Sequence, residues 1–440
     1  MSDEIHEDDC GCQEYNELSR RQFLGGAAVM SAASLFPAWL PKIVLAKSAS
    51  TRDIVVSVFM RGGADGLSLV APYGDPAYYT SRTTIAIPQP DSASTTTRGI
   101  DLDGFFMFPQ AMAGLTTAYA AKDLLITHAT GQTYVSRSHF DAQRYMETGK
   151  PADPNLITGW LGRHLASIPP LNPAAPLRGV GISNGLQRSM VAPIGGTGMY
   201  PTKTLPIADP TNFTIGGSAS TVAARTAFIQ ADYATAEEPV HSAALDATNT
   251  LALLKSVNFT GYKPANGITY PTSSFGRALR ALAVLITNNV GIEAAAIDIG
   301  GWDTHSAQNP INGSMANTMK DFSNSLAAFY GDIIATNPGV TLVANSEFGR
   351  NVRENGSNGT DHGRATTMFA MGKGIAGGRV LTKNWIPNML AKENLEAGQD
   401  LKVTLDYRDV LAEIVQNRLG NPNLDFVFPT WTPTMLGVTR

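Results

Sequence analysis

Cysteine is almost absent from this chain of 440 residues. The two cysteines, Cys10 and Cys12, lie close to the N-terminus, and the rest of the chain has none. From residue 13 onward the chain therefore offers no internal disulfide and no thiolate ligand for a metal. A metal site in that part would rely on ligands other than thiolates, such as carboxylate oxygens and imidazole nitrogens.

A long apolar span is also missing. The apolar stretch at residues 24–40 is rich in glycine and alanine, and Pro37 and Pro41 break it, so it is a poor permanent membrane anchor. Arg20 and Arg21 precede it, and Val44-Leu45-Ala46 follows it with small residues. This pattern predicts a cleaved twin-arginine (Tat) export signal over residues 1–46, with the Tat translocase as a partner during export. We expect the remaining chain to be periplasmic or secreted, without a stable membrane span.

Net charge is the third thing that is lacking. The whole chain has 33 basic and 37 acidic residues, and residues 1–46 hold three of the basic and seven of the acidic ones. The remaining 30 of each sign cancel. A neutral chain gives no reason to expect nucleic acid or an anionic membrane surface as a partner.

Residues 47–440 have the composition of a globular protein, and apolar runs typical of buried strands alternate with helical patterns. We expect strands at 53–60, 123–129, 292–299, 340–345 and 366–372, and helices at 138–149, 274–289, 315–335 and 407–420. This alternation predicts one α/β domain, with a doubly wound, mostly parallel sheet and helices on both faces. Residues 195–260 interrupt it, first irregular or hairpin-like and then helical, as a cap or insert.

Polar clusters stand where the expected strands end, and in parallel sheets that edge is where ligands bind. The clusters are Arg61–Gly66, Ser136–His139, Trp302–His305, Ser346–Arg350 and Asp361–Gly363. In an extended chain Asp303 and His305 point to one side, as two ligands of one ion would. The donor types suit one or two Zn²⁺, Mn²⁺, Mg²⁺ or Ca²⁺ ions. The metal-ligand candidates are Asp65, Asp303, His305, Glu347, Asp361 and His362.

The cluster at 136–139 supplies the catalytic candidates. Ser138 lies at the start of an expected helix, where backbone N–H groups favour an anion, and a metal could activate its hydroxyl as a nucleophile. His139 is beside it. Arg137, Arg61 or Arg350 could hold an oxyanion through a bidentate contact. Two metal ions about 4 Å apart assist phosphoryl-type transfer in this way.

Several motifs in this order also resemble a known family. They are "FMRGGADGLSLVAPYGDPAYY", "SRSHFDAQRYMETG", "IDIGGWDTH", "SEFGRNVRENGSNGTDHGRATTMFAMGKGIAGGRV" and "YRDVLAEIV". Together they are similar to the Tat-exported proteins of the domain of unknown function 1501 family. That family in turn resembles the alkaline phosphatase and sulfatase superfamily, whose members hydrolyse phosphate or sulfate esters with divalent metals.

The resemblance implies roles for individual residues. Asp65 would be the early metal aspartate, and Ser138 the nucleophile. Asp303 and His305 would be a later ligand pair, and Glu347 a second acidic ligand. Asp361 and His362 would match the superfamily's last His-Gly element. The implied activity is metal-dependent hydrolysis of a small-molecule or polymer ester of phosphate or sulfate.

Two other functions fit parts of the sequence. The motif Gly181–Gly185 matches the G-x-S-x-G elbow of serine esterases, with Ser183 as nucleophile, Asp303 or Asp361 as the acid and His305 or His362 as the base. Pro193 and two glycines interrupt the helix that such an elbow needs. The chain could also be a non-catalytic exported protein for carbohydrate binding or surface assembly.

Overall fold

The computed structural model of the chain describes residues 52–213 and 218–440. The predicted export signal at residues 1–46, with Arg20 and Arg21, lies outside the described residues, so it stays a prediction. None of the described helices is long and apolar enough to cross a membrane.

The core of the fold is a nine-stranded sheet. Its strand order is β10-β4-β9-β8-β1-β7-β5-β6, and β11 pairs with β4. β2 and β3 form a separate antiparallel pair. The strands are β1 Ile54–Met60, β2 Ile100–Asp101, β3 Met107–Phe108, β4 Leu124–Gly131, β5 Gly179–Ile182, β6 Thr204–Pro206, β7 Ala294–Ile299, β8 Val340–Asn345, β9 Thr366–Met371, β10 Arg379–Leu381 and β11 Leu405–Asp406.

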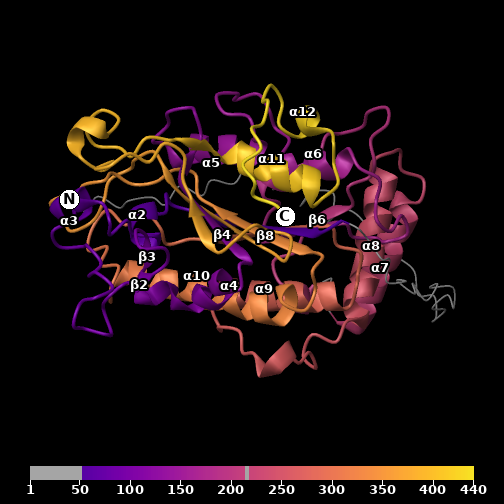
Figure 1. Ribbon diagram of the computed structural model, residues 1–440. Helices are drawn as coiled ribbons and strands as arrows, with labels where there is room; N and C mark the ends of the chain where they lie inside the picture. The colour runs from indigo at the N-terminus through magenta and orange to yellow at the C-terminus, as the bar shows by residue number, and fades with distance from the viewer. Residues whose placement is uncertain (1–51, 214–217) are drawn as a thin grey trace, which may run out of the picture. The chain divides into compact units, whose positions relative to one another are not determined.

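Helices cover both faces of this sheet. Figure 1 shows α4, α9 and α10 on one face and α5, α6 and α11 on the other. The α-helices are α2 Gly66–Leu69, α3 Pro76–Ser81, α4 Thr116–Ala120, α5 His139–Thr148, α6 Trp160–Ala166, α7 Ala219–Tyr233, α8 Val240–Ser256, α9 Ser274–Thr287, α10 Ser314–Phe329, α11 Tyr407–Asn417 and α12 Leu424–Val427. Shorter turns are the 3₁₀ segments η1 Gln110–Leu115, η2 Arg188–Met190, η3 Pro210–Asn212, η4 Ala265–Gly267 and η6 Lys392–Asn394, and the π-helical η5 Tyr330–Ile334.

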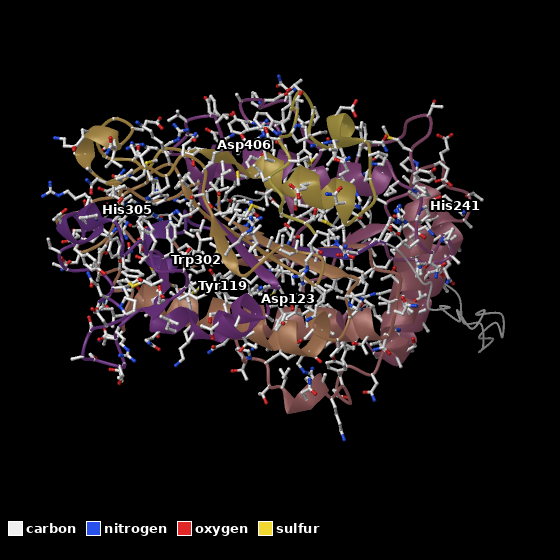
Figure 2. The ribbon with its side chains drawn as sticks, viewed as in Figure 1. Tyr119, Asp123, His241, Trp302, His305 and Asp406 are labelled. Atoms are coloured by element: carbon white, nitrogen blue, oxygen red, sulfur yellow. The ribbon has the colours of Figure 1, made fainter. Side chains whose placement is uncertain are left out.

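Residues 195–260, expected as an insert, contribute an edge strand and a helical pair. β6 pairs with β5 in parallel, so this segment is not a hairpin. α7 and α8 pack on each other, and α7 buries none of its side chains. Figure 2 places His241 of α8 at one end of the fold and His305 at the other. The helical pair therefore does not cover the polar edge where His305 lies.

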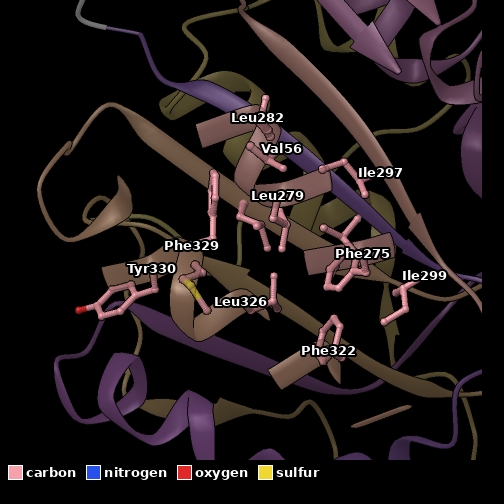
Figure 3. Close-up of a cluster of buried hydrophobic side chains, with 14 of the residues drawn as sticks. Val56, Phe275, Leu279, Leu282, Ile297, Ile299, Phe322, Leu326, Phe329 and Tyr330 are labelled. Carbon is pink, nitrogen blue, oxygen red and sulfur yellow. The ribbon is translucent and has the colours of Figure 1, made fainter. Parts of the chain in front are cut away.

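The central strand β1 shows why the sheet has a core on both faces. Successive side chains of a strand point to opposite faces. Val56, Val58 and Met60 join the core that α9 and α10 cover, part of which Figure 3 shows. Val55 and Phe59 join the core under α6 and α11. The predicted fold class, a mostly parallel α/β sheet wound on both sides, is confirmed.

One strand departs from the parallel arrangement. β9 runs antiparallel to both β4 and β8, its neighbours. Its first residue, Thr366, therefore lies at the edge where β4 and β8 end. Residues 346–365 connect β8 to β9 at that one edge, so the cluster before β9 joins the clusters that follow β1, β4, β7 and β8.

Candidate metal centre

His139 is placed by the start of α5, which has the predicted boundaries. Ser138 is the N-cap, and its hydroxyl accepts a hydrogen bond from the backbone N–H of Asp141 at 3.5 Å. Gly149 ends the helix with φ of 66°, a left-handed conformation that glycine adopts without a steric penalty. The loop after β4 thus places His139, the first residue of α5, at the edge of the sheet where β4 and β8 end.

Four side chains from three separate segments meet at this edge. His139, Asp303 and His362 each offer a ligand atom, and these atoms all lie within 4.8 Å of one another. His305 joins them, because its Nε2 lies 3.1 Å from Oδ1 of Asp303 and 3.0 Å from Nε2 of His362. Among residues 52–213 and 218–440, no other group of His, Cys, Asp or Glu side chains meets the same criterion for holding an ion.

Each of the three imidazole rings is held by its other nitrogen. Nδ1 of His139 lies 2.7 Å from Oε1 of Glu347, and Nδ1 of His305 lies 3.0 Å from Oδ1 of Asp361. Nδ1 of His362 lies 2.9 Å from the backbone oxygen of Arg137. Carboxylate and carbonyl oxygens only accept, so each Nδ1 donates its hydrogen. In the neutral rings every Nε2 then carries a free lone pair.

These lone pairs fit a cation. The Nε2 atoms of His305 and His362 lie 3.0 Å apart, where two lone pairs repel unless a proton or a metal ion lies between them. Nε2 of His139 is buried and has no hydrogen-bond partner among the described residues. Two nitrogens bound to one tetrahedral zinc ion at about 2.0–2.1 Å lie roughly 3.3 Å apart. Carboxylate or carbonyl acceptors behind the histidines are the usual support of metal-bound imidazole.

Asp303 supplies the negative charge of the cluster. Burial by itself would raise the pKa of Asp303, but the hydrogen bond and the charge of Arg350 outweigh it and lower this pKa to about 2. Nη2 of Arg350 lies 2.6 Å from Oδ1 of Asp303. The carboxylate is therefore ionised at any physiological pH and available as a metal ligand.

Glu347 is buried behind His139 and is held there by several donors. Its Oε1 accepts from the backbone N–H of Gly62 and from Nε2 of Gln143, both at 2.9 Å. Burial raises the pKa of Glu347, but the hydrogen bonds from His139 and Gln143 prevail and lower it. The same contact raises the pKa of His139, whereas burial lowers the pKa of His362.

Gly62 is a point of close backbone approach. Its φ is 119°, and a Cβ placed there would lie 2.7 Å from the backbone nitrogen of Asp303. Its carbonyl oxygen accepts from Arg350, whose guanidinium also binds the carbonyl oxygens of Gly63, Thr360 and Trp302. Arg350 thus joins the loops that carry Asp303 and His362. Its guanidinium points toward these protein oxygens and not toward a ligand.

Asp65 lies in a different network. It is fully buried and forms a two-pronged ion pair with Arg82, with oxygen–nitrogen distances of 2.5 and 2.9 Å. It also accepts from Ser68 at 2.7 Å and from Gln308 at 2.6 Å. Burial raises its pKa, but Arg82 dominates and lowers it. The structure therefore does not bring Asp65 to the cluster formed by Asp303 and the histidines.

The remaining predicted residues surround the cluster. Glu347 and Asp361 contact histidine Nδ1 atoms. Arg137 holds His362 through its backbone oxygen, and its guanidinium lies 2.7 Å from Asp400. The guanidinium of Arg61 lies 3.2 Å from Glu147 and 3.0 Å from Asp298.

Ser183 of the esterase-like motif lies apart from the histidines. It follows β5, its hydroxyl donates to the backbone oxygen of Gly185, and the 3₁₀ turn η2 comes next in place of a long helix. Ser183 lines a cavity of about 540 Å³, and none of the described residues that line this cavity is a histidine. No hydrogen bond between Ser183 and His305 or His362 is present in the described part of the chain.

Sequence reasoning overlooked Gln143 and Glu147. They follow His139 at intervals of four residues, which places all three on one face of α5. Gln143 contacts Glu347, and Glu147 contacts Arg61. The spacing itself was a signal in the sequence. Asp400, which binds Arg137 and Asn351, gave no such signal because it lies in an irregular segment.

Comparison with known proteins identified a family but no curated relative. A search of the curated proteins found no match. Among solved structures, the alkaline phosphatase of the Antarctic bacterium TAB5 is similar at 12% identity, with 77% of this chain and 96% of that chain covered and a TM-score of 0.30. A mutant of the same enzyme with magnesium bound in its M3 site gives the same values. At this TM-score the likeness adds nothing to the geometry above.

The family profile named "Protein of unknown function (DUF1501)" matches residues 155–414, which is more than half of the chain. Asp303, His305 and His362 lie inside the matched residues, and His139 precedes them. The resemblance to this family noted in the sequence is therefore confirmed, and the chain belongs to the DUF1501 family of proteins of unknown function.

Proposed function

We propose that this protein is an exported, metal-dependent hydrolase of phosphate or sulfate esters. One observation carries the proposal. Three imidazole rings, each fixed through Nδ1, direct free Nε2 atoms toward the carboxylate of Asp303. Export to the periplasm or beyond it is proposed from Arg20 and Arg21 in the sequence.

His139, His305, His362 and Asp303 would hold the ion. Three nitrogen donors and one carboxylate favour Zn²⁺ or Mn²⁺ over Mg²⁺ and Ca²⁺, which prefer oxygen ligands. A bound divalent ion supplies Lewis-acid polarisation of an ester oxygen and a more acidic coordinated hydroxyl or water. Glu347 and Asp361 keep His139 and His305 in the tautomer that leaves Nε2 free to bind.

Ser138 is the proposed nucleophile. It precedes His139 directly, its side chain is exposed, and it stands at the N-terminus of the ten-residue helix α5, where backbone N–H groups favour an anionic ester. Arg137 is the proposed anion-binding cation. Its side chain is 44% exposed and one of its nitrogens contacts Asp400, so other donors of the guanidinium stay open to a ligand. Arg350, by contrast, is engaged by protein oxygens and positions Asp303.

The first test is the metal content of the full chain, purified without chelators. We expect one equivalent of zinc or manganese, and its loss in an Asp303→Ala/His305→Ala double variant. An Asp232→Ala/His241→Ala variant is the matched control, because both residues belong to the helical pair α7 and α8, at the end of the fold opposite His305. The control should keep the metal.

The second test is turnover of 4-nitrophenyl phosphate, bis(4-nitrophenyl) phosphate and 4-nitrophenyl sulfate by the metal-loaded protein. Hydrolysis that the double variant and chelators abolish supports the proposal. Hydrolysis that survives the loss of metal contradicts it and favours a serine esterase. A protein that binds no metal, even after incubation with zinc or manganese, contradicts it as well and favours a binding role.

A further inference from the structure

The cavity beside the metal centre has not yet been assigned a role. It measures about 540 Å³ and opens at the ends of β1, β5 and β7, alongside α5. Its polar lining includes the arginines Arg61, Arg144 and Arg188, the acids Asp141, Glu147 and Asp298, and the neutral residues Gln143, Ser183 and Gln187. The three positive and three negative charges balance, while donors and acceptors are plentiful.

The cavity shares a wall with the metal centre. On α5, His139 faces Asp303 and Glu347, and Gln143 lies about one helical turn further, roughly 6 Å along the axis. The amide of Gln143 bridges the two sites, because its Nε2 donates to Glu347 and its Oε1 accepts from Arg61 at 3.0 Å. A substrate with its ester group at the metal centre can therefore extend its organic part into the cavity.

The aromatic ring of Phe140 stands at the same cavity. It lines the cavity and yet is 84% exposed, which leaves a large apolar face open to a ligand. An aromatic face next to balanced donors and acceptors matches a ring that carries both C–H faces and hydroxyl groups. A second phosphate would meet Glu147 and Asp298, and a purely apolar group would leave the polar lining unpaired.

We propose that this cavity binds a neutral polyhydroxylated group, such as a sugar or polyol, as the organic part of the ester. The inference rests on the proposed function, since the ester group itself is assigned to the metal centre. Phe140 packs on a ring face, and the carboxylates and arginines of the lining bind the hydroxyls. The nearby metal centre then acts on an ester at the edge of that group.

Binding without turnover tests this inference separately from hydrolysis. The full chain is examined by saturation-transfer NMR with methyl α-glucoside, N-acetylglucosamine and myo-inositol at millimolar concentrations, both metal-loaded and after chelation. Phe140→Ala removes the exposed ring. Phe228→Ala is the matched control, because Phe228 is an exposed aromatic residue on α7.

We expect saturation transfer to at least one of these three compounds in the wild type and in Phe228→Ala, with and without metal. We expect a loss of at least severalfold in Phe140→Ala, which is not expected to affect folding because its side chain is exposed. Absence of transfer to all three compounds in the wild type overturns the inference, and so does transfer that Phe140→Ala leaves unchanged.

The results also separate the two proposals. If the protein binds a polyol but hydrolyses none of the esters, the proposed hydrolase function is wrong and the assignment of the cavity stands. If the protein shows metal-dependent hydrolysis but binds no polyol, only the assignment of the cavity is wrong.

Discussion

The Nδ1 atom of His139 lies 2.7 Å from Oε1 of Glu347, although the two residues are 208 positions apart in the chain. This contact fixes which nitrogen of His139 carries the hydrogen and turns Nε2 toward Asp303. Because Glu347 is completely buried and also accepts from Gly62 and Gln143, the ring has little freedom to turn away.

Replacing Glu347 by glutamine keeps the shape of the side chain and removes its charge. We expect Glu347→Gln to weaken zinc binding by about 10- to 100-fold, as is typical when the acceptor behind a metal-bound histidine is lost. The measurement is competition with a chelating dye at neutral pH. Glu237→Gln, at an exposed position before α8, is the control. Unchanged affinity in Glu347→Gln would remove Glu347 from this role.

The two serines in the sequence motifs, Ser138 and Ser183, should respond differently to replacement by alanine. Ser138→Ala should lower kcat for a phosphate ester by about three orders of magnitude and leave the metal content unchanged, since the hydroxyl caps α5 without binding the cluster. Ser183→Ala should leave kcat unchanged for 4-nitrophenyl phosphate, which has no polyol part, because the Ser183 hydroxyl contacts only its own loop among the described residues. Steady-state kinetics with metal analysis decides between them, and the reverse pattern would favour the esterase.

The buried pair of Asp65 and Arg82 makes a prediction about stability. Arg82→Met leaves the carboxylate of Asp65 buried without its cation, and we expect a loss of about 3–5 kcal/mol in the free energy of unfolding. Asp65→Asn/Arg82→Met should recover part of this loss, since it removes the isolated charge. Urea denaturation gives the values, with the exposed Arg353→Met as control. A loss below about 1 kcal/mol would mean that solvent reaches Asp65.

Two buried histidines outside the metal centre predict how stability depends on pH. Burial lowers the pKa of His128 to about 4 and the pKa of His164 to about 3. The hydrogen bonds of His128 require a neutral ring, because Nδ1 accepts from the backbone N–H of Ala129 at 2.8 Å and Nε2 lies 3.0 Å from the backbone oxygen of Val70. In the unfolded chain both rings take up a proton near pH 6.5.

Between about pH 6.5 and pH 4 the unfolded state therefore binds more protons than the folded state. Stability should fall as the pH falls, by about 1.4 kcal/mol per pH unit for each of the two residues. Urea denaturation at a series of pH values measures this slope. His128→Asn should reduce it by the share of one residue, whereas Phe228→Ala, which replaces an exposed residue that does not titrate, should not change it. If His128→Asn leaves this slope unchanged, the ring of His128 is charged in the folded protein.

Local signals in the sequence predicted much of the fold. Ser138 and Gly149 mark the ends of α5, and the β-branched run at residues 54–60 forms the central strand. These features depend on neighbouring residues alone, so they can be read without the fold. The spacing of Asp303 and His305 is also local, and both lie in the observed cluster.

Long-range pairing could not be read in the same way. A carboxylate beside a histidine motif looks the same in sequence whether it binds a metal or the histidine's Nδ1, as Glu347 and Asp361 do here. Asp65 follows its strand as a metal aspartate would, but its contacts depend on Arg82 and on Gln308, which is 243 positions away. The antiparallel direction of β9 was not predicted either, since a buried apolar run carries no direction.

The antiparallel direction of β9 means that the metal centre forms only when the whole sheet has assembled. His139, Asp303 with His305, and His362 come from segments that only the assembled sheet brings together, and His362 arrives only after β9 has turned back beside β4 and β8. From residue 13 onward the chain has no cysteine with which to form a cross-link. A bound ion would join three loops that are distant in sequence, and it would stabilise the folded state because the unfolded chain offers no such site. Metal occupancy would then report whether a given molecule has finished folding.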